Sequence, residues 1–397
     1  NDERDDWLKR GVRSDAGDLY RQQDVNVTLQ HEYWGSSGTG GYSDLKAHTT
    51  MLHVDAPLSD GRMFFRTDMV NMDAGSFSTA SNGSFNPKWG TCASTPCYGH
   101  TSQTADGASV AVGWENSTWA MDIGTTPMGF EVVDVVGGIS YSSDIGPLGY
   151  TVNAHRRPVS SSMLAFAGQV DPNTHKTWGG VRSTGGGVSV SYDKGEANGI
   201  WSSLNADSLT GENVADNWRV RWMTGYYYKL INANNERLTV GLSNMLWHYD
   251  KDLSEYTLGQ GGYYSPQQYV SFALPINWRK RTENWSWELG GSVSWSHSKS
   301  NDGKRYPIQS LIPVEPGRYG DRSEPEEGSS SSGTGYTARA IIERRVTSNW
   351  FVGLGVDIQE AKDYTPSHAL MYVRYSAAGW QGDMDIPPQP LMPYAEW

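Results

Sequence analysis

The sequence has no run of about 18 consecutive apolar residues, the minimum for a membrane-spanning helix. Its mean hydropathy of -0.58 is also low, so helical membrane proteins are excluded. Basic residues are in deficit, because 32 Lys and Arg stand against 44 Asp and Glu and leave a formal net charge of -12. A nucleic-acid-binding surface needs excess positive charge, so we expect no nucleic-acid partner.

Cysteine is nearly absent, and its two copies, Cys92 and Cys97, lie in one Gly-, Ser- and Asn-rich loop. They form either a small disulfide-closed loop, which an oxidising compartment permits, or two unpaired thiols. A zinc site lacks nearby ligands, so we expect no metal and no cofactor. The nine His residues show no compact spacing with a nucleophile or acid, so we predict no catalytic residues and no enzyme activity.

Aromatic residues with a polar edge are abundant, with 17 Trp and 22 Tyr against 8 Phe. The segment 285–295 shows why they matter. Trp285, Leu289, Val293 and Trp295 fall on one face of an extended strand, and Ser and Glu residues fall on the other. Ten steps on a strand tilted by about 40° span roughly 25 Å, the height of the apolar band of an outer-membrane barrel, with Trp at both interfaces.

The same alternation recurs along the chain, and an even strand count is typical of single-chain bacterial barrels. We therefore predict an all-β fold, a transmembrane antiparallel up-and-down β-barrel of about 16 strands. The strands include 25–29, 285–295 and 350–358. The other predicted strands are centred on Met51, Phe65, Val112, Met121, Val135, Val152, Val190, Leu204, Trp222, Leu242, Phe272, Ala340 and Val373.

Short and long connections alternate between the predicted strands. Short periplasmic turns and long extracellular loops are typical of such barrels, so both termini are expected on the periplasmic side. The expected short turns are 116–117, 144–146, 195–198, 233–235, 282–284 and 347–349, and the long loops are 75–104, 158–178, 208–217, 250–267 and 301–332. We expect residues 1–23 to be a charged periplasmic connector or the end of a helical repeat region, residues 24–376 the barrel, and residues 377–397 a Pro-rich periplasmic tail. The charged start at Asn1 is not a signal peptide, so we expect a processed or partial chain.

Inward-facing polar residues are the candidates for lining a lumen. Both charge signs are mixed there, which favours a neutral or zwitterionic permeant, although mutual pairing for stability accounts for many of them equally well. The predicted inward set is Arg66, Asp68, Glu115, Asp122, Arg219, Arg221, Glu288, Arg339, Glu343 and Asp357.

Three segments rich in aromatic, Gly and Pro residues depart from a simple barrel pattern: 124–130, 259–269 and 387–394. Aromatic rings next to amides and hydroxyls suit carbohydrate, because sugar C–H groups stack on rings while hydroxyls accept and donate hydrogen bonds. Polymer-guiding candidates are therefore Tyr263, Tyr264, Gln267 and Tyr269, with an interface girdle as the alternative. In the tail, Trp380, Tyr394 and Trp397 are candidates for a gate, with a disordered tail or an assembly signal as the alternative.

These segments, together with A-L-M-Y-V-R-Y at 369–375, resemble the C-terminal region of the bacterial cellulose synthase operon protein C family. The resemblance implies an outer-membrane channel that exports cellulose, a β-1,4-glucan that is modified in some cases. It implies as partners the cellulose chain, outer-membrane lipid and lipopolysaccharide, and a periplasmic tetratricopeptide-repeat region of the same full-length protein that links to the inner-membrane synthase. The alternatives are a general diffusion porin and, less favoured, an outer-membrane hydrolase or a surface lectin.

Overall fold

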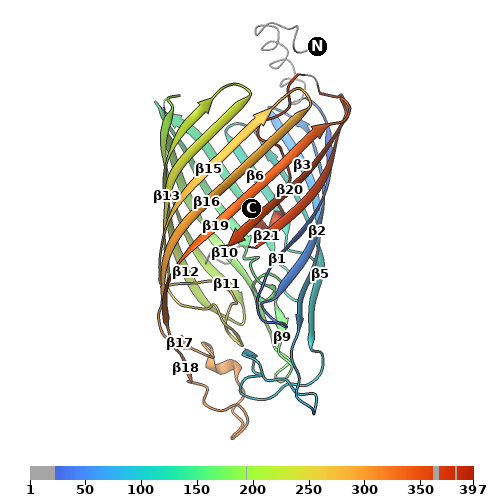
Figure 1. Cartoon of the computed structure of the whole chain (residues 1–397). Coiled ribbons are helices and arrows are strands. Elements are labelled where there is room, and N and C mark those ends of the chain that lie inside the picture. The colour runs from blue at the N-terminus through green and yellow to red at the C-terminus, as the bar shows by residue number, and fades with distance from the viewer. Residues whose placement is uncertain (1–22, 194, 361–365, 381) are drawn as a thin grey trace.

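A computed structural model of the chain describes residues 23–193, 195–360, 366–380 and 382–397. Within these residues, sixteen long strands form one closed antiparallel barrel (Figure 1). Each strand pairs with its neighbour in chain order, and β1 pairs with β21 to close the cylinder. The predicted fold is therefore confirmed. The barrel strands are β1 (Asn26–Ser36), β2 (Leu45–Leu58), β3 (Gly61–Ser76), β5 (Ser102–Glu115), β6 (Trp119–Thr125), β7 (Val135–Ile145), β8 (Leu148–Pro158), β10 (Thr177–Tyr192), β11 (Asn198–Glu212), β12 (Val214–Asn232), β13 (Glu236–Tyr249), β15 (Gln268–Arg281), β16 (Trp285–Ser300), β19 (Ser329–Arg345), β20 (Trp350–Glu360) and β21 (Ser367–Ser376).

The remaining elements are short and are not among the sixteen strands of the barrel wall. No helix in the described part of the chain is long and apolar enough to cross a membrane. The tail, expected to be extended throughout, ends in one 3-10 turn directly after Pro393, because no proline follows to block it. The short elements are β4 (Trp89–Gly90), α2 (Met163–Ala167), β9 (Gln169–Val170), β14 (Tyr256–Thr257), β17 (Gly303–Lys304), η2 (Gln309–Leu311), β18 (Pro325–Glu326) and η3 (Tyr394–Glu396). The predicted connector 1–23 falls almost wholly outside the described residues.

The outer face of the barrel is apolar, and strand β16 shows how the sequence sets it. Val293 and Trp295 are 60% and 44% exposed on the outside, whereas Ser286 and Glu288 on the alternate positions are buried inside. Leu289 continues the outward series. A water-soluble protein does not expose a continuous band of this kind, whereas a lipid bilayer solvates it.

The two ends of the barrel differ in their connections, as expected, with one exception. The segment 208–217, predicted to be a long loop, is a hairpin in which Asn213 alone separates β11 from β12. Asn213 adopts a positive φ of 50°, as a tight turn requires. The strands continue because Leu209 and Val214 are buried against other connections at that end.

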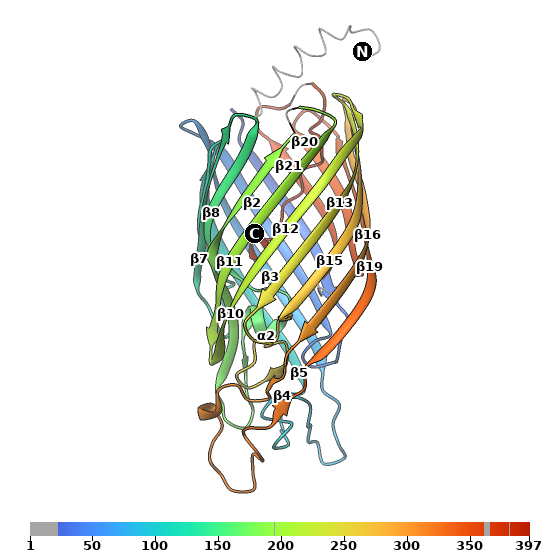
Figure 2. The ribbon, with the colours of Figure 1, turned by 90° about the vertical axis from the view of Figure 1, so that its left-hand side faces the viewer.

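The long connections fold together at one end, opposite the end that carries the short turns (Figures 1 and 2). We call the residues 77–98, 159–176, 250–267 and 301–328 the loop cap. Its core includes Phe85, Trp89, Tyr263 and Tyr306, and Trp178 from the start of β10 packs into the same cluster. Strand β4, between β3 and β5, pairs in parallel with β14, between β13 and β15. These connections start half-way round the barrel from each other, so the loop cap lies across the barrel mouth.

Candidate functional site: the lumen and the C-terminal tail

The C-terminal tail, residues 377–397, turns back into the barrel, and both views place the C-terminus inside the cylinder (Figures 1 and 2). It first crosses the short-turn end. There Arg345 of β19 donates hydrogen bonds to the carbonyl groups of Trp380, at 3.3 Å, and Gly382, at 2.8 Å. Arg281 of β15 donates to the carbonyl of Met384 at 3.0 Å. Guanidinium groups thus satisfy the backbone acceptors of a segment whose prolines prevent regular structure.

The predicted tail residue Trp380 packs on the inner wall. The guanidinium carbon of Arg374 lies 4.7 Å from the ring centres of both Trp380 and Phe351. Arg374 also forms an ion pair of 3.1 Å with the fully buried Glu343, which accepts a second hydrogen bond of 2.7 Å from the Tyr372 hydroxyl. Because each member of this group has a partner, a buried charge is tolerated here, and Glu343 serves to anchor the tail.

Deeper in the lumen, Gln30 of β1 holds the tail backbone at Leu391. Its side-chain amide donates to the Leu391 carbonyl and accepts from the Leu391 N–H, both at 2.7 Å. Gln30 is completely buried. The pair of hydrogen bonds imitates one step of strand pairing and fixes the depth at which the tail sits.

Tyr394 fills the next position and contacts two of the predicted lumen carboxylates. Its backbone N–H donates to Asp68 at 2.8 Å, and its hydroxyl donates to Asp122 at 2.6 Å. Asp68 pairs with Arg66 of the same strand, and Asp122 forms two hydrogen bonds of 2.6 and 2.7 Å with Arg157 of β8. Both pairs are bidentate, because Arg66 also donates to the two oxygens of Asp68, at 3.0 and 3.1 Å, and such geometry makes the pairs directional.

Trp397, the last residue, lies between the two guanidinium groups of these pairs. The centre of its ring is 5.3 Å from the guanidinium carbon of Arg66 and 5.7 Å from that of Arg157. Its indole N–H donates to the Met392 carbonyl at 3.3 Å, so the end of the tail folds on itself. Cation–π contacts of this kind contribute about 0.5–2 kcal/mol each, depending on how far water is excluded.

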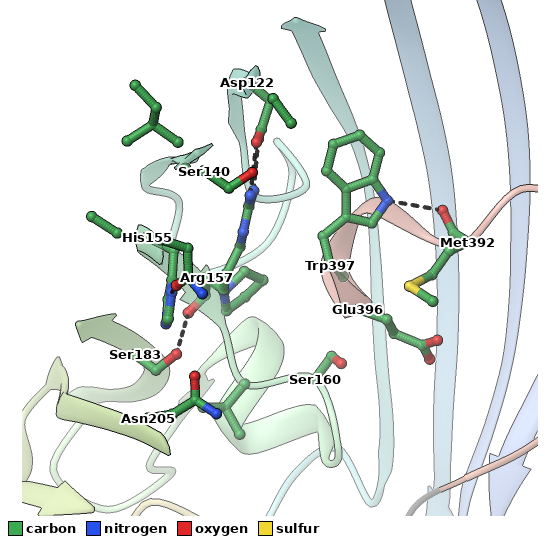
Figure 3. A pocket seen from close by; sticks show the side chains of 18 of the residues that line it. Asp122, Ser140, His155, Arg157, Ser160, Ser183, Asn205, Met392, Glu396 and Trp397 are labelled. Carbon is green, nitrogen blue, oxygen red and sulfur yellow. Dashed lines mark hydrogen bonds and ion pairs between the residues drawn. The ribbon is translucent and has the colours of Figure 1, made fainter. Parts of the chain in front are cut away.

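A cavity of about 900 Å³ remains in the lumen beside the end of the tail. Figure 3 shows Trp397 on one side of it and His155, Arg157 and Asn205 on the other. The lining therefore combines one aromatic face with amide, hydroxyl and charged groups. Such a surface is suited to contact with hydroxylated, uncharged molecules.

The polar wall of this cavity is held by Asp207. It accepts from Arg219 at 2.9 Å and from His155 at 2.7 Å. The other ring nitrogen of His155 contacts Asn153 at 2.9 Å, so both nitrogens are engaged within the wall. Ser183 donates to the Arg157 carbonyl at 3.5 Å instead of facing the imidazole.

The structure places most of the predicted lumen residues on the inner face, where charges of opposite sign meet. Glu288 is typical, because it pairs with Arg339 at 2.9 Å and with Arg279 at 3.0 Å, while Arg339 also reaches Asp357 at 3.7 Å. Many of these inner-face charges are thus paired with one another, which is the alternative that the sequence left open. The predicted residues found on the inner face are Arg66, Asp68, Glu115, Asp122, Arg219, Arg221, Tyr269, Glu288, Arg339, Glu343 and Asp357.

Two of the predicted polymer-guiding residues lie elsewhere, and their assignment to the lumen wall is wrong. Tyr263 is 3% exposed in the core of the loop cap, where its hydroxyl accepts from Asn217 at 3.0 Å. Gln267 is buried as well and accepts from the Asn301 N–H at 2.7 Å. The segment before Gln268 is irregular, with positive φ at two glycines, so strand alternation does not apply to it. Tyr264, partly buried, packs edge-on against Tyr269 with ring centres 6.1 Å apart.

Sequence reasoning missed Arg157, Asp207 and Gln30 as site residues. The signal for Asp207 was present, because it shares the inner face with Asn205 and stands directly opposite Arg219 in the register. The partners of Arg157 and Gln30 come from another strand and from the tail, and no spacing in the sequence indicates them.

The two cysteines form the disulfide, with an S–S distance of 2.05 Å, and both are fully buried in the loop cap. Asp171 lies beside them, but sulfur atoms bonded to each other offer no thiolate to a metal ion. Nearby, burial raises the pKa of Glu255 above its ordinary value, and the neighbouring Glu326 adds to the effect. The loop cap thus holds one carboxyl group whose charged form is unfavourable.

Fold and lumen together define a large single-chain β-barrel of the outer-membrane type. A solved structure described as a bacterial polysaccharide outer membrane secretin superposes with a TM-score of 0.51, covering 89% of this chain and 96% of the other at 10% identity. At that identity the likeness concerns the fold alone.

The model of the cellulose synthase operon protein C C-terminus matches residues 43–378, so the chain belongs to that family. Cellulose synthase operon protein C of Salmonella typhimurium is 73% identical over all of this chain, which covers 34% of the relative. The Escherichia coli K12 protein of that name is 72% identical with the same coverage. In Pseudomonas fluorescens a protein of that name is 30% identical over 91% of the chain. The chain thus spans about a third of the length of these curated relatives.

Proposed function

We propose that this barrel is an outer-membrane channel that exports cellulose, a β-1,4-glucan, from the periplasm to the cell surface. Guidance is passive: many weak stacking and hydrogen-bonding contacts hold the polymer in register, and none is strong enough to trap it. The protein acts without catalysis and without a cofactor.

The observation that carries the proposal is the chemistry of the lumen. Many of its charges are held in pairs, such as Asp122 with Arg157 and Asp207 with Arg219, while Arg221 lies against the Trp247 ring. They leave a polar cavity of about 900 Å³ with an aromatic face. A strongly charged permeant would need an excess of one sign. A neutral, hydroxylated polymer needs hydrogen-bonding groups and flat apolar surfaces.

In this proposal the tail and the loop cap are gates. The tail fills one side of the lumen, and the loop cap lies across the opposite mouth, so each moves aside when polymer passes. Trp380, Tyr394 and Trp397 hold the tail in place, and their contacts are individually of modest strength.

We further propose the orientation and the partners. The short-turn end and both termini face the periplasm, and the loop cap faces the cell surface, where it meets lipopolysaccharide. The apolar outer band contacts outer-membrane lipid. The longer relatives contain residues beyond the segment matched by this chain. We assign to those residues of the full-length protein the periplasmic tetratricopeptide-repeat region, which links the barrel to the inner-membrane synthase.

Single-channel recording in a planar bilayer tests the function. Cello-oligosaccharides and then malto-oligosaccharides are added to the short-turn side of the purified chain. Preferential block by the cello series supports export of a β-1,4-glucan. Equal response to both series indicates a general diffusion porin and contradicts the proposal. A barrel that never opens is examined again after removal of residues 377–397.

A further inference from the structure

Two aromatic side chains on neighbouring strands of the lumen lie directly over glycines of the paired strand. Trp201 of β11 stands opposite Gly225 of β12, and Tyr227 of β12 stands opposite Gly199 of β11. A methyl group added to Gly225 would meet the indole nitrogen of Trp201 at 2.4 Å, and one added to Gly199 would meet the Tyr227 ring at 2.2 Å. Each aromatic side chain therefore occupies the space directly above a glycine, against bare backbone. Only glycine allows so close an approach.

Covering a strand glycine with an aromatic ring also stabilises a sheet, so the arrangement alone does not indicate a binding site. A binding site also requires that the ring remain accessible from the lumen. Tyr372 lies over Gly353 in the same way, but it is 2% exposed and bonded to Glu343 beneath the tail. Trp201 and Tyr227, on the strands β11 and β12, remain partly exposed.

Trp201 forms one wall of a second cavity, of about 460 Å³, at the short-turn end of the barrel. Hydroxyl groups dominate the rest of the lining, and among the described residues no Lys or Arg contributes to it. The lining includes Ser142, Asp144, Thr151, Ser189 and Ser191. Serine and threonine hydroxyls both donate and accept, as the hydroxyl groups of a sugar do.

We propose that Trp201 is a stacking subsite for a glucose unit of the polymer at the entrance of the lumen, with Tyr227 next to it. In a β-linked glucose unit the hydroxyls lie round the rim and the C–H groups point to the two faces. The indole takes one face while the serine and threonine hydroxyls meet the rim. Strand β8 contacts the tail through Arg157 and contributes Thr151 to this site, but no described tail residue lines the cavity, so an arriving polymer is bound while the tail is still docked. This inference rests on the proposed export function.

The test is a titration of the full chain in detergent micelles with cellohexaose and maltohexaose, followed by saturation-transfer NMR. Trp201→Ala is expected to weaken cellohexaose binding about 3- to 10-fold, the usual worth of one ring contact, and Trp201→Tyr to retain most of it. The matched control is Trp295→Ala, which removes an indole from the outer face of β16, away from the cavity, and should change nothing.

A second variant keeps the test independent of the folding of Trp201→Ala. The only native cysteines are bonded to each other, so Ser189→Cys supplies a single reactive thiol inside the cavity. Cellohexaose should slow its modification by a thiosulfonate reagent, and maltohexaose should slow it less.

The outcomes separate the two proposals. Wild-type binding that Trp201→Ala leaves unchanged, or that Trp295→Ala weakens equally, overturns the subsite and leaves the export function standing. Unprotected labelling of Ser189→Cys under conditions where cellohexaose binds also overturns it. Absence of any cellohexaose binding to the wild type contradicts both the subsite and the export function.

Discussion

Replacement of Gln30 by Ala should loosen the tail inside the barrel. The side chain makes two hydrogen bonds of 2.7 Å to the backbone of Leu391 and is fully buried. A net contribution of about 1 kcal/mol for each bond gives roughly 2 kcal/mol, or about a 30-fold shift toward the undocked tail. The Leu391 N–H and carbonyl then lose their partner, so the shift should be concentrated in the last ten residues of the chain.

Hydrogen exchange of the C-terminal peptide, measured on the full chain, reports this equilibrium directly. The amide of Leu391 should exchange about 30 times faster in Gln30→Ala, provided that docking controls its exchange. The matched control is Leu29→Ala, which truncates the neighbouring outward-facing residue at 53% exposure and leaves the lumen intact. Exchange within about twofold of the wild type in Gln30→Ala, or equal acceleration by both variants, would refute the reasoning.

Deletion of residues 377–397 should raise single-channel conductance and change polymer export, because the tail occupies the lumen; an assembled truncation with unchanged behaviour contradicts the gating role. Replacing Cys92 and Cys97 together by Ser should destabilise the loop cap by roughly 2 kcal/mol, seen as faster proteolysis of residues 301–328, and an unchanged cleavage rate would argue against it. Burial raises the pKa of Glu255, so the folded loop cap binds a proton more readily than the open loop cap does. The stability of the loop cap should therefore fall as the pH rises from the ordinary glutamate pKa through the raised one. The assay is amide hydrogen exchange of the loop cap in the wild type and in Glu255→Gln. The ratio of the two exchange rates isolates the effect of Glu255, because the pH dependence of the intrinsic exchange reaction cancels. A ratio that stays constant with pH would disprove the prediction.

The barrel followed from the sequence because its determinants are local. In β16 the alternation of Trp285, Leu289, Val293 and Trp295 with small polar residues fixes which face meets lipid, and the period of two leaves no other solution. The inward positions of Arg66, Asp122 and Glu288 follow from the same rule. The alternation rule failed at Tyr263 and Gln267, because these residues precede β15 and lie in irregular backbone.

The sequence by itself thus determined the fold class, the outward and inward faces and the candidate charges of the lumen. Tertiary structure alone decided which charges pair, where the tail lies and what covers the mouth. Asp122 meets Arg157, Gln30 meets Leu391 and Trp89 meets Trp178 only because the closed cylinder brings distant strands and loops to one axis. Side-chain alternation is a property of each strand, whereas a lumen exists only once the last strand pairs with the first.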